Sequence, residues 1–111
     1  MKTREEQRAY FRAYYRANKD KYREKRGRYE GRLRSLILAS KDKPCADCGG
    51  RWPPLIMELD HREGEVKQFN VGDWLGLRCV GEAGLRAEIA KCDAVCPTCH
   101  RIRTFKRRGL L

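Results

Sequence analysis

The first thirty residues carry a pattern of hydrophobic and polar positions that is typical of a helix. Over residues 3–30, aromatic side chains recur at helical spacing among Ala, Arg, Glu and Lys residues, and no proline interrupts the run. Thr3 followed by Glu6 matches a capping box, the signature of a helix N-terminus. The pattern predicts one long helix over residues 3–30, with a hinge near Gly27 and Gly31.

The rest of the chain alternates short apolar segments with turns, which is typical of an α+β fold. PCADCGGRWPP is rich in Gly and Pro and predicts a knuckle-like turn. Residues 62–71 predict a loop that leads to a short extended piece, and residues 72–84 are ambiguous because they hold four glycines. The other segments predict a helix over 32–41, a strand over 55–61, a helix over 85–92, a short strand at 93–96 and a basic closing helix from Pro97 to near Gly109.

The composition points to a polyanionic partner. The 111-residue chain has a net charge of +11 and a pI of about 9.7, so nucleic acid is the simplest partner. Residues 1–44 hold 15 Lys and Arg against 6 Asp and Glu, and the remainder is nearly balanced. We therefore divide the chain into a basic helical DNA-binding arm, residues 1–35, and a second domain, residues 36–111.

The arm has two interpretations, which can hold together on different faces of the helix. Its aromatic side chains would pack on the domain or on another copy of the chain. Its Arg and Lys side chains would lie along DNA and contact phosphates, with Arg12 and Arg16 as candidates. A merely solvated charged face is the plainer alternative.

No apolar run in the sequence approaches the length of a membrane span. Residues 33–40 are too few and follow a long basic stretch, so they do not fit a signal peptide. We therefore expect an intracellular, cytoplasmic protein with no membrane partner. Thiols stay reduced in that compartment, so the six cysteines indicate a metal more than disulfides.

Four of the cysteines form two CxxC pairs: Cys45 with Cys48, and Cys96 with Cys99. Two residues between thiols let both sulfur atoms reach one ion from a tight turn, and two such turns complete a tetrahedral zinc site. A closed shell of thiolates leaves no open position for catalysis, so this zinc would be structural. A redox CxxC with scattered buried cysteines is the alternative. Cys79 and Cys92 are expected to be small buried residues.

The chain has only two histidines, and each follows a residue type that binds metal ions. His61 follows Asp60 at the end of a predicted strand, and His100 follows the last CxxC cysteine. If zinc joins the two CxxC pairs, the strand predicted over 55–61 would lie beside DAVC. Asp60, His61 and His100 would then meet in one cleft. One carboxylate and two imidazoles beside a basic surface suit phosphodiester hydrolysis, because an imidazole deprotonates water near neutral pH and a metal ion neutralises the phosphate. A hydrogen-bonded, partly buried side chain is the alternative for each histidine.

Together these motifs resemble the HNH endonucleases, a family with a zinc-stabilised ββα-metal core. The matching segments lie within roughly residues 36–105, in the order PCADCG, the strand ending in ELDH, the loop REGEVKQFNV, and AEIAKCDAVCPTCHRIRT. This order of motifs is specific, whereas a DH or a CxxC alone is weak. More narrowly, the chain is similar to small HNH proteins of bacteriophages and prophages, so the expected compartment is the cytoplasm of a bacterial host.

The resemblance implies a role for each matching residue. His61 would be the general base that activates water. Asp60 and His100 would bind the catalytic ion, Mg²⁺ or Mn²⁺, and the four CxxC cysteines would bind structural zinc. Arg101 and Arg103, on the closing helix, would be candidates for phosphate contact.

One position departs from the family pattern. Where the family often has an Asn, five residues before the third zinc cysteine, this chain has Lys91. Asn70, in the loop, is a candidate for the orienting role of that Asn. Lys91 and Lys67 are further candidates for DNA contact, and a plain exposed lysine is the equal alternative for Lys67.

The expected function is a metal-dependent DNA endonuclease that hydrolyses phosphodiester bonds. With one cleft per chain it would nick DNA, acting as a monomer or a dimer. Its cofactors would be structural zinc and catalytic magnesium or manganese, and the resemblance adds phage terminase or packaging proteins as candidate partners besides DNA. The alternatives are a zinc-stabilised DNA-binding module without catalysis and a zinc-stapled protein that binds another protein through its aromatic arm.

Overall fold

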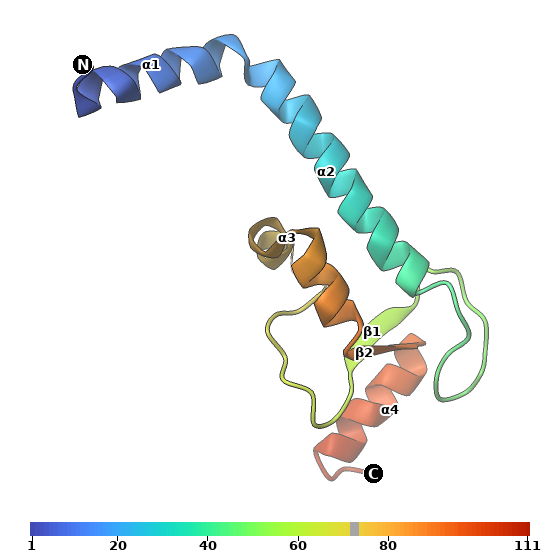
Figure 1. Cartoon of the computed structure of the whole chain (residues 1–111). Helices are drawn as coiled ribbons and strands as arrows, with labels where there is room; N and C mark the ends of the chain where they lie inside the picture. The colour runs from blue at the N-terminus through green and yellow to red at the C-terminus, as the bar shows by residue number, and fades with distance from the viewer. Residues whose placement is uncertain (72–73) are drawn as a thin grey trace. The chain divides into compact units, whose positions relative to one another are not determined.

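The structure of the protein, a computed structural model, describes residues 1–71 and 74–111, and of residues 74–80 the backbone alone. Its elements are α1 (Arg4–Ala17), α2 (Lys19–Ser40), β1 (Glu58–His61), α3 (Trp74–Ile89), β2 (Cys92–Val95) and α4 (Pro97–Arg107) (Figure 1). The fold combines helices with a small two-stranded sheet, as the sequence predicts in coarse terms. The chain divides into two compact units, Met1–Arg32 and Leu33–Leu111.

The basic arm begins as the sequence predicts and then differs. The capping box is confirmed: the Glu6 amide donates to the Thr3 hydroxyl at 3.2 Å, and the Thr3 amide donates to the Glu6 carboxylate at 2.7 Å. The prediction of one helix over residues 3–30 is wrong, because α1 ends at Ala17 with Asn18 as its cap and α2 begins at Lys19. The Asn18 side chain donates to the Tyr14 carbonyl at 2.8 Å, a local bond that competes with continuation of the helix.

No break in the helix marks the hinge predicted near Gly27 and Gly31. α2 continues through both glycines and takes in residues 32–40, which the sequence predicts as part of a separate helix. Glycine in a helix interior costs about 1 kcal/mol relative to alanine, which is too little to break a helix by itself. Among the helices of the described residues, none combines the length and the apolar character needed to cross a membrane.

The sheet joins two segments that are distant in the sequence. β1 and β2 pair antiparallel, with Asp60 opposite Asp93. β1 is shorter than the predicted strand over 55–61, since only Glu58–His61 pair. β2 leads directly into α4, whose first turn contains Pro97 as predicted.

α3 consists of two helical segments that meet at Gly81. This residue has φ 68° and ψ 178°, a conformation that favours glycine and interrupts the helix. The helix predicted over 85–92 is the second segment, and it ends earlier, at Ile89. Residues 62–71, before α3, form a loop as predicted. The ambiguous stretch 72–84 begins with two residues that lie outside the described part of the chain.

A small core in the second unit is built from residues of the sheet, of the CxxC turns and of the segment before β1. It contains the following buried side chains: Cys45, Met57, Ala94, Val95 and Cys96, with Leu59 and Cys99 packed against them. The cysteines are therefore part of the core itself, and whatever holds them together also holds the core.

Candidate metal centre and active-site cavity

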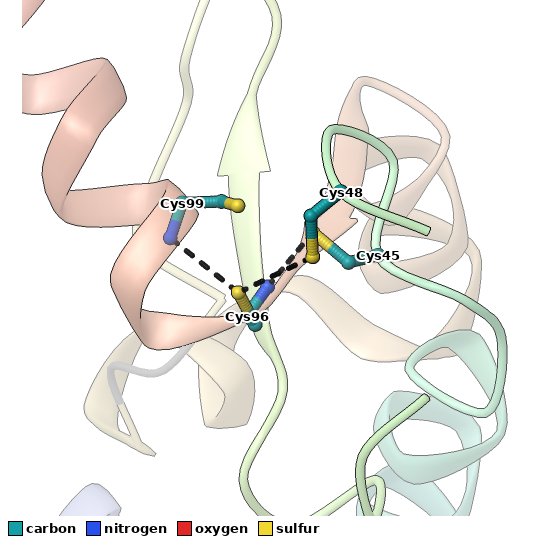
Figure 2. A group of neighbouring side chains, drawn as sticks. All are labelled: Cys45, Cys48, Cys96 and Cys99. Atoms are coloured by element: carbon teal, nitrogen blue, oxygen red, sulfur yellow. Dashed lines mark hydrogen bonds between the residues drawn. The ribbon is translucent and has the colours of Figure 1, made fainter. Parts of the chain in front are cut away.

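The four CxxC cysteines meet in the second unit, two from the loop after α2 and two from the start of α4 (Figure 2). Their sulfur atoms all lie within 4.8 Å of one another, and those of Cys48 and Cys96 are 4.0 Å apart. Sulfur atoms placed about 2.3 Å from a tetrahedral zinc ion are about 3.8 Å apart. The cluster could therefore hold a structural metal such as zinc, as the sequence predicts.

Local backbone geometry directs each pair of thiols to the same point. In the first turn the Cys45 amide donates to the Gly50 carbonyl at 2.9 Å, and Gly49 takes a φ of 73° that favours glycine. In the second, Cys96 caps α4, and its sulfur accepts from the Cys99 amide at 3.4 Å. The Cys96 amide also donates to the Cys45 sulfur at 3.3 Å, which joins the two turns.

The thiols of the cluster differ widely in proton affinity. Burial acts to raise the pKa of Cys45, but hydrogen bonds from backbone amides, first that of Cys48 and then that of Cys96, outweigh it and lower the pKa to about 6. The hydrogen bond with Cys96, followed by burial, raises the pKa of Cys99 to about 12. Thiolates this close repel one another, and a divalent cation among them removes the repulsion and keeps all four deprotonated.

A cavity of about 600 Å³ lies in the second unit, and α4 forms part of its wall. Its lining comes from β1, the loop after β1 and α4: Leu59, Asp60, His61, Lys67, Asn70, Val71, His100 and Arg107. The structure thus brings together every residue that the sequence analysis assigns to catalysis. It adds Arg107, which no motif indicated.

His100 is held by a carboxylate at one ring nitrogen and faces Asp60 with the other. Its Nδ1 pairs with the Glu58 carboxylate, so Nδ1–H donates, and in the neutral ring Nε2 keeps a lone pair. Nε2 lies 3.5 Å from Oδ1 of Asp60. Two lone pairs at this distance repel each other unless a proton or a metal ion lies between them, so the pair is suited to bind a cation.

Asp60 is buried, and two arginines of α4 hold its carboxylate. Arg107 donates to Oδ1 at 2.8 Å and to Oδ2 at 2.7 Å, and Arg103 donates to Oδ2 at 3.0 Å. Burial acts to raise the pKa of Asp60, but hydrogen bonds from Arg107 and Arg103 outweigh it and keep the pKa below its usual range. A carboxylate has about four lone-pair positions. These contacts leave one on Oδ1, the oxygen that faces His100.

Arg103 binds three carboxylates at once. Besides Asp60, it makes two hydrogen bonds of 2.6 Å to Asp47, in the first CxxC turn, and two of 3.1 Å to Asp93, on β2. These five bonds match the five N–H donors of a guanidinium. Arg103 therefore ties the cysteine cluster to the sheet, and its predicted phosphate contact stays a prediction.

We expect Arg103→Ala to lower the free energy of unfolding of the metal-loaded protein by about 2 kcal/mol, because three carboxylates lose a shared cation. Arg103→Lys should recover little, since one ammonium cannot bridge the same three partners. Urea unfolding followed by circular dichroism measures both. Arg101→Ala is the control, since Arg101 is an exposed arginine of the same helix. Its guanidinium lies over the Phe105 ring, 5.9 Å from the ring centre. Equal stability of the two alanine variants would contradict the role.

His61 pairs with a carboxylate to which the sequence motifs assign no role. Its Nε2 lies 2.8 Å from Oε1 of Glu88, which is buried on α3. Glu88 also accepts from the Gln68 amide at 3.0 Å and pairs with Lys91 at 3.2 Å. Lys91 in turn donates to the Val66 carbonyl at 2.8 Å. Lys91 is therefore engaged between α3 and the loop, and its predicted contact with DNA stays a prediction.

The remaining candidates for DNA contact are exposed cations. Arg12 and Arg16 continue a row begun by Arg4 and Arg8, and the spacing of four residues aligns these side chains along one side of α1. The first unit also contains a hollow of about 770 Å³, lined by aromatic and basic side chains: Tyr15, Tyr22, Lys25, Arg26, Arg28, Tyr29 and Arg32. A basic surface with exposed rings suits contact with phosphates and bases.

The sequence analysis assigns no role to four charged residues of the site: Asp47, Glu58, Glu88 and Arg107. Glu58 could have been identified, because it lies two residues before Asp60 and so on the same face of β1. Cys92 is buried as predicted, and its burial raises the pKa of its thiol to about 11. The side chain of Cys79 lies outside the described residues.

Compared with protein-family models, with curated proteins and with solved structures, the chain gives no match. The resemblance to HNH endonucleases therefore stays a prediction carried by the motifs alone.

Proposed function

We propose that the protein is a metal-dependent DNA endonuclease of the HNH type. The observation that carries the proposal is the cavity that Asp60, His61 and His100 share. Two antiparallel strands followed by a helix and joined to a cysteine cluster fit a ββα-metal core. Structural zinc in that cluster would fix the start of α4, and with it His100, beside β1.

Asp60 and His100 would bind the catalytic ion. Neighbouring ligands at about 2.1 Å from one Mg²⁺ are about 3.0 Å apart in octahedral geometry, and opposite ligands are about 4.2 Å apart. Oδ1 of Asp60 and Nε2 of His100, at 3.5 Å, would reach one ion as neighbouring ligands after a small adjustment. Glu58 supports the site because its pairing with Nδ1 leaves the Nε2 lone pair free. Mg²⁺ or Mn²⁺ bound there would neutralise charge on the scissile phosphate and on the leaving oxygen.

His61 would act as the general base. Because its Nε2 is engaged with Glu88, Nδ1 is the nitrogen available to take a proton from water. Within the described part of the chain, Nδ1 has no hydrogen-bond partner. The base and the ion-binding pair line one cavity, so they would act on one phosphate. A monomer with one such cavity would cut one strand.

The basic arm would bind the phosphate backbone and raise the affinity for DNA. The arginine row of α1 and the cations around the hollow of the first unit support this role. Lys67, on the rim of the cavity, and Arg101, on α4, are further candidates for phosphate contact.

Nicking of supercoiled plasmid tests the proposal. The zinc-loaded protein should convert supercoiled DNA to open circles with Mg²⁺ or Mn²⁺, and EDTA should abolish the reaction. His100→Ala should abolish it as well, because the ion loses one of its two protein ligands. Folded, zinc-loaded protein that leaves the plasmid intact with every divalent ion tried would reject the endonuclease.

One observation favours a second function, a zinc-stabilised DNA-binding module without catalysis. The Asp60 carboxylate already accepts three hydrogen bonds from Arg103 and Arg107, which compete with a metal ion for it. The same assay separates the two functions when DNA binding is measured beside it. A protein that retards DNA in a gel but never nicks it would support the binding module.

A further inference from the structure

Glu88 is a buried charge that the proposed mechanism does not yet use. Its side chain is 2% exposed, and a carboxylate at such a position is costly unless both oxygens are paired. It lies on α3, about one helical turn before β2 begins. Its hydrogen-bond partners therefore decide whether its role is in stabilising the core or in positioning groups of the cavity.

Both oxygens of Glu88 have partners. Each partner either belongs to β1 or to the loop after it, or binds that loop. Oε1 lies 2.8 Å from Nε2 of His61 and accepts from the Gln68 amide at 3.0 Å. Oε2 accepts from Lys91 at 3.2 Å, and Lys91 also donates to the Val66 carbonyl at 2.8 Å. The pair thus holds the loop at two points of its backbone and the imidazole at one ring nitrogen.

This geometry fixes which nitrogen of His61 can act. A carboxylate accepts but does not donate, so Nε2 must carry the hydrogen, and in the neutral ring the lone pair is on Nδ1. The bond also fixes rotation of the ring about its attachment to the strand. The His61 side chain is 14% exposed and lines the cavity, so the exposed part of the ring faces the space where substrate would lie.

We infer that Glu88 is a positioning residue for His61: it binds Nε2–H, sets the tautomer and aims Nδ1 at the water that attacks the phosphate, while Lys91 neutralises its charge and ties the loop to α3. This inference rests on the proposed endonuclease function, for which it supplies the device that orients the base. Glu88 acts through His61 and does not itself touch the substrate.

Nuclear magnetic resonance of the full, metal-loaded chain with ¹⁵N-labelled histidine tests the bond without any nuclease assay. An imidazole N–H held by a buried carboxylate should give a downfield proton signal that exchanges slowly with water. We expect this signal from His61 in the wild-type protein and its loss in Glu88→Ala. Glu88→Gln should keep a shifted signal, because an amide oxygen can still accept from Nε2–H.

Nicking kinetics test the consequence. Glu88→Ala should lower kcat by about 10–100-fold, the usual effect of losing a group that orients a functional histidine, with KM for DNA unchanged. Glu88→Gln should recover most of the loss. The same two substitutions at Glu82 are the matched control, since this partly exposed residue lies on the same helix and pairs only with Arg86 at 3.2 Å among the described residues.

The readouts separate failure of this inference from failure of the proposed function. A wild-type protein without the slow-exchanging signal overturns the inference even if it nicks DNA. A folded Glu88→Ala protein with wild-type kcat also overturns it. If Glu88→Ala does not fold, Glu88→Gln decides, and a loss of the His61 signal there counts against the pairing. If the wild-type protein gives the signal but never nicks DNA, the pairing of Glu88 with His61 stands. The endonuclease proposal is then overturned, and with it the role of Glu88 in positioning a catalytic base.

Discussion

His61→Ala should reduce the rate of metal-dependent nicking by about 10²–10⁴-fold, the usual contribution of a general base. The water would then lose its proton without help from the protein. DNA affinity and zinc content should stay close to wild type, because His61 belongs neither to the arm nor to the cysteine cluster. Stability should fall by about 1–2 kcal/mol, since Glu88 loses a hydrogen-bond partner. Initial rates on supercoiled plasmid at saturating Mn²⁺ measure the effect.

The control for His61→Ala is Glu63→Ala, since Glu63 is an exposed residue of the loop after β1 that does not line the cavity. Its nicking rate should equal that of the wild type. A His61→Ala protein that nicks as fast as this control would remove His61 from the role of base. If all three proteins bind DNA and none nicks it, the DNA-binding module becomes the better account.

The parts of the site that the sequence predicts are those in which short local motifs carry the chemistry. A CxxC turn brings its two sulfur atoms together by its own backbone geometry, so two such turns could be identified from spacing. Asp60 and His61 are adjacent on one strand, and His100 follows a cysteine of the cluster. Once the two turns meet, little freedom is left for where these side chains lie.

The charges that orient those side chains are contacts between distant segments, and no local pattern records them. Glu88 and His61 are 27 residues apart, and Arg107 and Asp60 are 47 residues apart. Each pairing depends on how α3, the loop and α4 pack on the sheet. Position 91 illustrates this limit: the resemblance offers Asn70 for the orienting role of the Asn, and that role stays a prediction, whereas the bonds to His61 and its loop come from Glu88 and Lys91.

The arm was predicted less well, for a local reason. Composition predicts helix correctly from Thr3 onward, but it does not predict that Asn18 ends one helix and begins the next. The Asn18 amide and side chain both donate to the end of α1, and its carbonyl accepts from the Tyr22 amide at 3.1 Å in α2. Two exposed glycines looked like stronger breakers, yet neither has a side chain that competes for backbone bonds.

Removal of the metal should unfold the second unit. The small core contains Cys45 and Cys96 themselves, so without a cation the thiolates of the cluster repel one another beside the buried Met57 and Val95. Structural zinc in comparable small sites contributes about 10–16 kcal/mol of apparent binding free energy, more than a core of this size supplies alone. A strong chelator should therefore abolish cooperative unfolding of residues 33–111, and added Zn²⁺ should restore it. Elemental analysis of the purified protein should give one zinc per chain.

Substitution of single cysteines separates loss of the metal from loss of a buried side chain. Cys96→Ser should reduce the zinc content to well below one per chain and unfold the unit, because a hydroxyl is a poor replacement for a thiolate ligand. Cys92→Ala is the matched control: this cysteine is also buried, yet it lies outside the cluster. It should keep one zinc and lose about 1 kcal/mol of stability. If Cys92→Ala lost the metal and Cys96→Ser kept it, or if chelation left the unfolding transition unchanged, the cluster would not be the element that holds this unit together.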